Sequence, residues 1–439
     1  MLEYTSYALI LLSLGAYVLL DGYDLGIGVL SLFDRSDQRR KEYSELIATA
    51  WDANESWIIL AGVLLWAGLP AVYATVLPGV YLPLVVMLLA IVLRGTAIEL
   101  QSAAPGYRRG WGLVFGLSSL VAALCQGLVG GAVLSGLPHR GGMFTGGTWD
   151  WLTPYSVLTA LGLTAVYLLA GAAWLQDKTT GTAHERAGRL GRPLLPAVAA
   201  VSVVLGFGLR LADPQHLRFD QPLRAALFGI AVVVAAACGA IAWYGFGRRP
   251  DWRPFAAVAG AEAAGLLALV AATAPVVVPP DLTVHAAAGP RGSQLFLLIG
   301  VGSCIPVVLA YNIYAWWVFR GKFAQPPARN GGPDPSSGAP DPSTGGPGPS
   351  SGAAAAELHT AEARAEDDGP WAAVVGRRVL LTLLAVAVAA LSQDVFGGVR
   401  AWIGPVGVAV CSVTALAVWI RSDRRSEAAG EFDLPAAEK

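Results

Sequence analysis

Long stretches of apolar residues recur along the chain and set its architecture. A helix that crosses the ~30 Å hydrocarbon layer of a membrane needs about 20 mostly apolar residues, because each residue rises ~1.5 Å. Nine such stretches precede residue 325, at roughly 5–32, 54–75, 79–98, 111–134, 153–175, 191–211, 224–246, 254–274 and 293–319. Two more follow at roughly 374–393 and 401–420. Leu, Val and Ala run consecutively in these stretches, without the alternation of a membrane β-barrel, so the pattern predicts helices.

The composition points to the same class of protein. Charged residues make up only 14% of the 439 residues, and 55% are hydrophobic. A soluble globular protein carries about 25% charged residues, because its surface faces water, so an ordinary cytosolic enzyme is excluded. The balance of 30 Lys and Arg against 31 Asp and Glu excludes nucleic-acid binding through basic charge, and four Cys are too few for a disulfide scaffold. The sequence therefore predicts an all-α polytopic membrane protein.

The basic residues predict how the chain is oriented. We expect the first stretch to be a span and not a cleaved signal peptide, because Glu3 replaces a basic n-region and Asp21 and Asp24 interrupt the apolar run. With the N-terminus outside, the inside loops collect 23 of the 30 Lys and Arg residues, and the outside loops collect six. Inside loops of membrane proteins carry this excess. We therefore expect a multi-pass protein whose N-terminus is outside and whose C-terminus is cytoplasmic.

One segment lacks the apolar pattern altogether. Residues 324–370 contain a run rich in Pro, Gly and Ser, without large apolar side chains between 330 and 352. Such a run cannot bury enough surface to offset its chain entropy, so we expect a disordered cytoplasmic linker. The linker would separate a nine-helix body, residues 1–323, from a two-helix membrane appendix with a cytoplasmic tail, residues 371–439.

The residues that the spans lack restrict the chemistry. All five His are predicted in loops or in the linker: His139, His184, His216, His285 and His359. The four Cys fall singly in four different spans, and no Walker sequence occurs. A haem needs an axial His, Met, Cys or Tyr, and a zinc or copper site needs clustered His or Cys. We therefore expect no metal or haem bound by this chain alone, and no nucleotide-driven pump.

Ionisable groups remain in three consecutive spans, near one depth. Six side chains fall in the cytoplasmic third of the first three spans: Asp21 and Asp24 in the first, Asp52 and Glu55 in the second, and Arg94 and Glu99 in the third. Such groups are costly in lipid and by default mark ion paths or buried pairs. Two interpretations stay open. The carboxylates of the second span cap a helix N-terminus, or the group forms a proton route or a buried ion network near a redox centre. Glu262, alone in the eighth span, is expected to face a protein interior.

Several motifs around these residues carry a family resemblance. The first span contains DGYDLGIGVL, the second opens with WDANESWIILAG, and the third ends with RGTAIEL. They are followed in order by YLLAGAAWLQDKTTG, VVPPDLTVHAAA and PVVLAYNIYAWWVFRGK. Together these segments resemble subunit II of cytochrome bd quinol oxidase, over residues 1 to about 323. The extension from 324 to 439 departs from the family pattern.

The resemblance implies a fold and a function. The family's oxidase takes electrons from quinol and reduces dioxygen to water in the aerobic respiratory chain of the bacterial plasma membrane. Its haems b and d lie in subunit I, which shares with subunit II a fold of two four-helix bundles plus a peripheral helix. Subunit II stabilises the haem-bearing subunit. The implied partners are that subunit, membrane lipid and quinone, and whether a small accessory subunit joins them stays open.

The resemblance also assigns roles to single residues. In the family, the Asp of the WD pair and the Arg of the RG motif help to line a proton pathway from the cytoplasm, and by motif these are Asp52 and Arg94. We infer that Asp52 and Asp24 relay protons and that Arg94 holds a carboxylate ionised by charge pairing. The chain would thus be part of an enzyme without being catalytic alone.

Three other functions compete with this one. The chain could bind haem itself, against which the His-free spans count. It could be a proton-coupled secondary transporter, although such proteins commonly show inverted repeats with a site at the midplane, and the acidic group here is off-centre. It could be a purely structural subunit whose charges form interface ion pairs.

Overall fold

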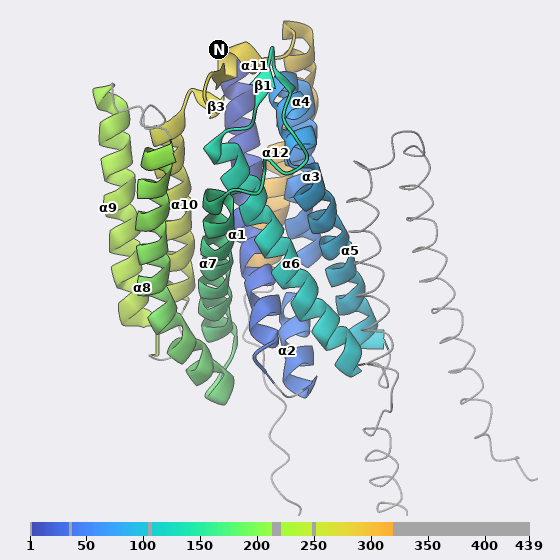
Figure 1. The fold of residues 1–439 in the computed structure, drawn as a ribbon. Coiled ribbons are helices and arrows are strands. Elements are labelled where there is room, and N and C mark those ends of the chain that lie inside the picture. The colour runs from blue at the N-terminus through green and yellow to red at the C-terminus, as the bar shows by residue number, and fades with distance from the viewer. Residues whose placement is uncertain (1, 35–36, 104–107, 213–220, 248–251, 319–439) are drawn as a thin grey trace, which may run out of the picture. The chain divides into compact units, whose positions relative to one another are not determined.

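The computed structural model describes residues 2–34, 37–103, 108–212, 221–247 and 252–318 (Figure 1). The predicted linker, the appendix and the spans at 374–393 and 401–420 lie outside these residues. The described part is mostly helical, as the sequence predicts, and strands occur in it only as short pairs.

Eight helices of the described part are long and apolar enough to cross a membrane. They are α1 (Leu2–Ser31), α5 (Tyr81–Ala103), α6 (Arg108–Ser135), α7 (Pro154–Lys178), α8 (Gly181–Ala212), α9 (Pro222–Gly245), α10 (Arg253–Thr273) and α12 (Arg291–Val318). Each overlaps one predicted span. The prediction of a polytopic helical protein is therefore confirmed.

The remaining predicted span, 54–75, is divided in the structure. Helix α3 (Trp51–Gly68) ends before Leu69, and α4 (Pro70–Gly79) begins directly after it. Pro70 has no N–H to donate and suits the first position of a new helix, while disfavouring helical backbone at the residue before it. At ~1.5 Å per residue, the 18 residues of α3 still extend for about 27 Å.

Several small elements connect the long helices. The polar helix α2 (Asp37–Ile47) follows α1 at the lower end of the view in Figure 1. At the other end, β1 (His139–Arg140) pairs with β2 (Met143–Phe144), and β3 (Val276–Val278) pairs with β4 (Leu282–Thr283), both antiparallel. The short helix α11 (Val284–Ala287) follows β4.

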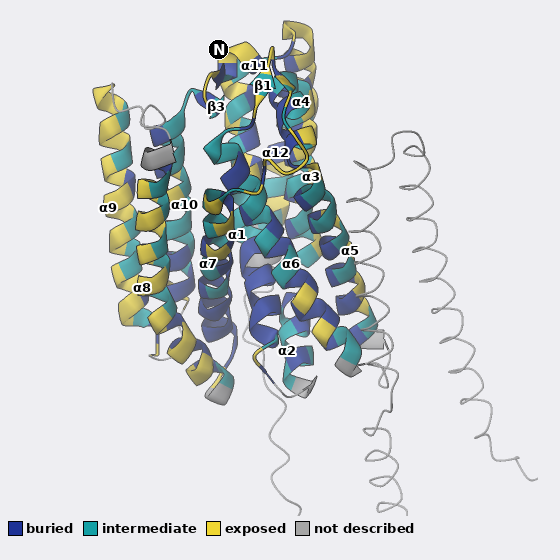
Figure 2. Ribbon diagram, in the orientation of Figure 1, coloured by how far each residue is buried: buried dark blue, intermediate teal, exposed yellow. Residues whose placement is uncertain are grey.

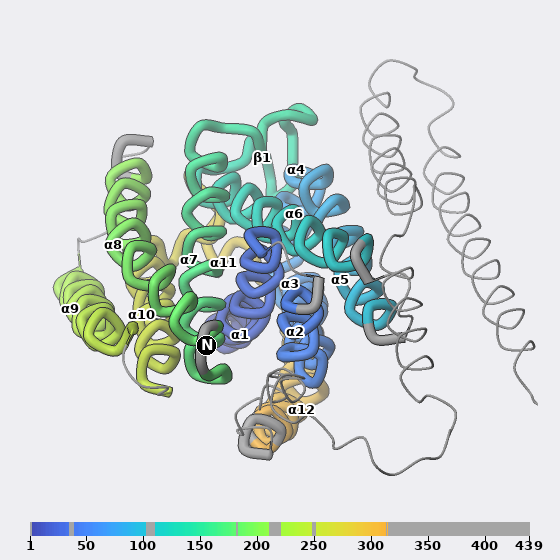
Figure 3. Tube along the Cα trace, turned by 90° about the horizontal axis from the view of Figure 1, so that it is seen from below, coloured from blue at the N-terminus to red at the C-terminus, as the bar shows by residue number. Residues whose placement is uncertain are grey.

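Helix α1 is central in the packing (Figure 3). It contacts α3, α6 and α7, and more weakly α2, α10 and α12. Its C-terminal third, from Asp21 to Ser31, is entirely buried. The closest approach is to α7, where a Cβ atom on Gly171 would lie 2.7 Å from the Gly26 carbonyl carbon. Small residues let helices in membranes pack at this distance.

The outer helices show the opposite pattern. Helices α8 and α9 expose most of their apolar side chains, and they are largely yellow in Figure 2. Lipid is the natural solvent for such surfaces, because soluble monomers rarely expose large continuous apolar patches. The molecule is therefore built around α1, and the ionisable group of the sequence lies near this central helix.

Candidate functional site

The centre of the site is a buried arginine. Arg94 of α5 donates a hydrogen bond from Nη2 to Asp21 Oδ1 on α1 at 2.6 Å, and a second, short one to Glu55 Oε1 on α3. Arg94 and Asp21 are completely buried, and the Glu55 side chain is 15% exposed. A charge buried this deeply is tolerated only when it is paired. Three helices are thus joined at one guanidinium.

A second carboxylate on α1 is held from α3. Asn54 Nδ2 lies 2.7 Å from Asp24 Oδ2, 3.1 Å from the Tyr23 hydroxyl and 3.2 Å from the Leu20 carbonyl oxygen. The Tyr23 ring stacks on Trp174 of α7, with ring centroids 4.4 Å apart. Asn54, a residue of the WDANESW motif, is therefore a structural link between α3 and the acidic end of α1.

The charges and hydrogen bonds of this site do not balance. One guanidinium faces three carboxyl groups, those of Asp21, Glu55 and Asp24. Within the described residues, Asp21 Oδ2, Asp24 Oδ1 and two Arg94 nitrogens are buried without a hydrogen-bond partner. Buried polar atoms nearly always have partners, often ordered water, and neighbouring carboxylates in a dry site do not all ionise. The arrangement is therefore suited to holding both water and protons.

Two of the six predicted site residues lie apart from this cluster. Asp52 is exposed in the first turn of α3, and Glu99 is exposed near the end of α5. Ala50, the N-cap residue of α3, makes no side-chain capping bond, and Glu55 is engaged by Arg94 and not by the helix terminus. The structure thus brings together Asp21, Asp24, Glu55 and Arg94, and leaves Asp52 and Glu99 on an outer face.

A further polar chain leads away from Asp21. The Tyr17 hydroxyl lies beside the Asp21 carboxylate and accepts a hydrogen bond from Gln126 Nε2 of α6 at 2.6 Å. Tyr167 of α7 donates to Gln126 Oε1 at 2.7 Å. Glu262 of α10 interacts electrostatically with Tyr167, and its Oε1 atom is buried with no hydrogen-bond partner in the described part. Glu262 was predicted to face the protein interior, whereas Gln126 was not predicted because a single Gln gives no pattern.

Metal-ligating side chains do not cluster in the described part of the chain. No group of three or more His, Cys, Asp or Glu there is placed to hold a metal ion. One correction concerns histidine. Helix α8 begins at Gly181 and not near residue 191, and its membrane-length stretch Ala183–Leu209 contains His184, so this residue lies in a span and not in a loop. Its Nδ1 atom is 2.9 Å from the Gln176 carbonyl oxygen, which makes it a bonded side chain at the helix start. His139 and His285, also predicted in loops, lie in β1 and α11.

The comparisons with known proteins decide the family. The family model for cytochrome bd terminal oxidase subunit II matches residues 2–319. The chain belongs to this family. The cytochrome bd ubiquinol oxidase subunit 2 of Bacillus subtilis is 26% identical over 318 residues, which is 69% of this chain and 91% of that protein.

Shorter alignments agree with this assignment. The cytochrome bd-I ubiquinol oxidase subunit 2 of Escherichia coli is 31% identical over 180 residues, which is 39% of this chain and 47% of the relative. A probable cytochrome oxidase subunit 2 of Haemophilus influenzae is 29% identical over 194 residues, 42% of this chain and 51% of the relative. The chain thus spans about half the length of these two relatives.

A solved structure shares the fold. A chain of the bd oxidase from Geobacillus thermodenitrificans superposes with a TM-score of 0.61 at 15% sequence identity, covering 73% of this chain and 99% of that one. At this identity the likeness speaks for the fold alone. Within the subunit II family, the Arg94 cluster is the feature of this chain from which a role can be argued.

Proposed function

We propose that this chain is the haem-free subunit II of a cytochrome bd-type quinol:oxygen oxidoreductase of a bacterial plasma membrane. It would stabilise a haem-bearing subunit I and contribute a cytoplasmic proton pathway for the reduction of dioxygen to water. The observation that carries the proposal is the family match over residues 2–319, together with the buried Arg94 cluster inside the matched region.

The haems b and d and the quinol site belong, in this proposal, to the partner. Haem chemistry supplies the electron transfer and oxygen reduction when the complex is assembled. The residues of this chain support placing the haems in the partner subunit, because the described His side chains already form hydrogen bonds or ion pairs with other groups and are not left to ligate a haem. His139 Nε2 lies 2.9 Å from Asp281, His184 Nδ1 2.9 Å from Gln176, and His285 Nδ1 3.1 Å from Glu3.

The proton pathway would begin at the exposed carboxylates. Asp52 lies one turn from Glu55, close enough for their charges to interact, and Glu55 is partly exposed while pairing with Arg94. Asp21 and Asp24 lie deeper: the Tyr17 hydroxyl lies beside Asp21, and Asp24 Oδ1 has no partner among the described residues, a position that water would occupy. The order Asp52, Glu55, then Asp21 and Asp24 thus leads from surface to interior, while Glu99 adds negative charge at the entrance.

The face that carries Asp52 and Glu99 is the proposed contact with subunit I, and the two carboxylates lie at its cytoplasmic edge, where the pathway would open. On α3, exposed residues recur at helical spacing: Asp52, Ser56, Ile59, Val63 and Trp66. On α5 the corresponding stripe is Leu88, Val92, Thr96 and Glu99. We call these two stripes the α3–α5 face. Carboxylates at such positions are costly against lipid, so a protein partner that covers the face accounts for them.

The remaining assignments rest on the sequence. The distribution of Lys and Arg supports an outside N-terminus and a cytoplasmic C-terminus. Nine helices in two four-helix bundles plus a peripheral helix, with two further C-terminal helices, would complete the fold if α3 serves as the ninth span. Membrane lipid, quinone and a small accessory subunit are further proposed partners.

Co-purification tests the proposal. The tagged full chain, expressed with its neighbouring genes and extracted in mild detergent, is expected to bring down a second polypeptide that carries haem, seen as a Soret band. The chain expressed alone is expected to lack that band. A Soret band from the chain alone would show that it binds haem itself, and substrate uptake by the chain alone would favour the transporter.

A further inference from the structure

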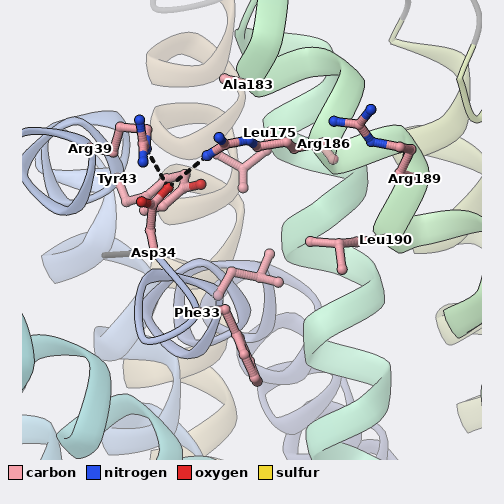
Figure 4. Close-up of a pocket in the computed structure, with 11 residues that line it drawn as sticks. Phe33, Asp34, Arg39, Tyr43, Leu175, Ala183, Arg186, Arg189 and Leu190 are labelled. Atoms are coloured by element: carbon pink, nitrogen blue, oxygen red, sulfur yellow. Dashed lines mark hydrogen bonds and ion pairs between the residues drawn. The ribbon is translucent and has the colours of Figure 1, made fainter. Parts of the chain in front are cut away.

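A cavity with a basic lining opens at the end of the molecule where α1 and α7 finish. It has a volume of about 480 Å³, and its walls come from α1, α2, α7 and α8 (Figure 4). This volume is within the range of about 300–1,000 Å³ that holds small ligands. None of its lining residues belongs to the Arg94 cluster, so the proposed proton pathway leaves the cavity without a role.

Three arginines gather along one side of this cavity. Arg39 Nε donates to Asp34 Oδ2 at 2.6 Å, and Arg186 Nη1 donates to the same oxygen at 3.2 Å. The buried Asp34 thus positions two guanidinium groups from different helices. Arg189, one turn further along α8, is exposed and forms no ion pair within the described residues. Glu42 of α2 is a second carboxylate that acts on Arg39, so the three arginines still outnumber the two nearby carboxylates.

The protonation states of the lining groups favour an anion. The hydrogen bond to Asp34 raises the pKa of Arg39, so that this guanidinium stays charged. Burial raises the pKa of Tyr43, so that the phenol beside it stays neutral and adds no negative charge. Guanidinium groups bind phosphate oxygens through parallel N–H bonds, which makes a phosphate the anion that this lining fits.

The other side of the cavity is apolar. Phe33 is 74% exposed and Leu190 is 44% exposed, and both lie below the arginines in the view of Figure 4. An inorganic phosphate would gain nothing from these side chains. A phospholipid would place its phosphate at the guanidiniums and its acyl chains along Phe33, Leu190 and the exposed apolar surface of α8. Basic pockets between membrane helices commonly bind lipid headgroups in this way.

We propose that this cavity binds the headgroup of an anionic phospholipid. Arg186 and Arg189 hold the phosphate, and Asp34 positions Arg186. Leu190 and Phe33 contact the acyl chains. The site requires only that this end of the molecule lies at the membrane surface. It is independent of the oxidase role and would be occupied whether or not protons pass through the Arg94 cluster.

Native mass spectrometry of the assembled complex tests the site, with phosphatidylglycerol as the probe. The complex that contains the double variant Arg186→Gln/Arg189→Gln is expected to show roughly a tenfold lower occupancy of one tightly bound lipid, because two charge-assisted contacts are lost. Arg189→Gln alone breaks no ion pair among the described residues and is expected to lower the occupancy without affecting folding.

The matched control is Lys41→Gln on α2. Lys41 pairs with Glu45 and lies outside the cavity lining. Equal lipid retention by the wild type and both arginine variants would overturn the proposal.

A second arm separates a lipid from a free phosphate. Leu190→Asn is expected to weaken phosphatidylglycerol binding, and inorganic phosphate in large excess is expected to leave the bound lipid in place. Displacement of the lipid by inorganic phosphate, with no effect of Leu190→Asn, would identify a soluble-anion site and contradict the lipid assignment.

Discussion

At the scale of single residues, one arginine organises the site. Arg94 bridges α1, α3 and α5 through Asp21 and Glu55, and its side chain is completely buried. Removal of one partner from a buried ion pair costs about 3–5 kcal/mol, because the other charge is left uncompensated. The stability of the helix bundle and its proposed proton chemistry therefore depend on the same side chain.

Arg94→Gln is expected to destabilise the protein more than Asp21→Asn does. The first change leaves two carboxyl groups without their cation, whereas the second leaves Arg94 paired with Glu55. The double variant Arg94→Gln/Asp21→Asn is expected to lose less stability than the sum of the two single losses, since coupled partners deviate from additivity by about 0.5–3 kcal/mol. Thermal unfolding of the detergent-purified complex measures this. Strict additivity would show that the two side chains do not act as a pair.

Asn54→Ala tests the link to Asp24. It removes one donor that serves Asp24, Tyr23 and the α1 backbone, so a loss of about 1–3 kcal/mol of stability is expected. Ser202→Ala on α8 is the control, because the Ser202 hydroxyl is exposed and donates only to the Val198 carbonyl oxygen. A surface change of this kind lies within about 0.5 kcal/mol of the wild type. If both variants melted alike, Asn54 would have no special role.

At the scale of elements, hydropathy predicted the spans well and helix faces poorly. Asp52 and Glu55 were expected on one face of the second span, since they are three residues apart. At ~3.6 residues per turn they differ by roughly 60° around the helix, which is enough to turn Glu55 toward Arg94 and to leave Asp52 outside. Which of the two points inward depends on how α3 packs against α1 and α5, and the local sequence does not contain that information.

Other differences have local causes. The break at Leu69 was marked in the sequence by Pro70, but an apolar window averages across it. The early start of α8 was hidden because its first turns are polar, and a hydropathy pattern detects only the part of a helix that is apolar. Helix α2 was missed for the same reason. The choice of Gln126 as a link between Tyr17 and Tyr167 is a purely tertiary feature.

The close contact of α1 and α7 gives a test at this scale. Gly171→Val would place side-chain atoms against the backbone of Gly26, so a loss of folded protein is expected, with a cost of at least the 1–3 kcal/mol typical of overpacking. Gly229→Val on α9 is the control, because a Cβ atom there meets nothing within 4 Å. Size-exclusion profiles of the two variants distinguish them. A monodisperse Gly171→Val protein with wild-type yield would contradict the close approach.

At the scale of the whole molecule, the family match ends at residue 319, before the segment that sets this chain apart. We propose that residues 324–370 are a linker and that residues 371–439 form a membrane appendix that the nine-helix body does not need for assembly. A chain truncated after residue 323 is then expected to assemble with the haem-bearing subunit at wild-type yield, as judged by haem content per purified complex. Failure to assemble would show that the appendix is part of the core.

The central claim is that this chain supplies protons to oxygen chemistry in a partner subunit, and the rate of quinol-driven oxygen consumption tests it most directly. Purified complexes that contain Asp21→Asn or Glu55→Gln are compared at equal haem content with the wild type and with Asp281→Asn, a change at an exposed carboxylate of the β3–β4 turn. The account predicts a rate roughly a hundredfold lower for the two cluster variants, the scale of losing a proton-transfer group, and an unchanged rate for Asp281→Asn. Wild-type rates in fully assembled cluster variants would contradict it and leave the chain a structural role only.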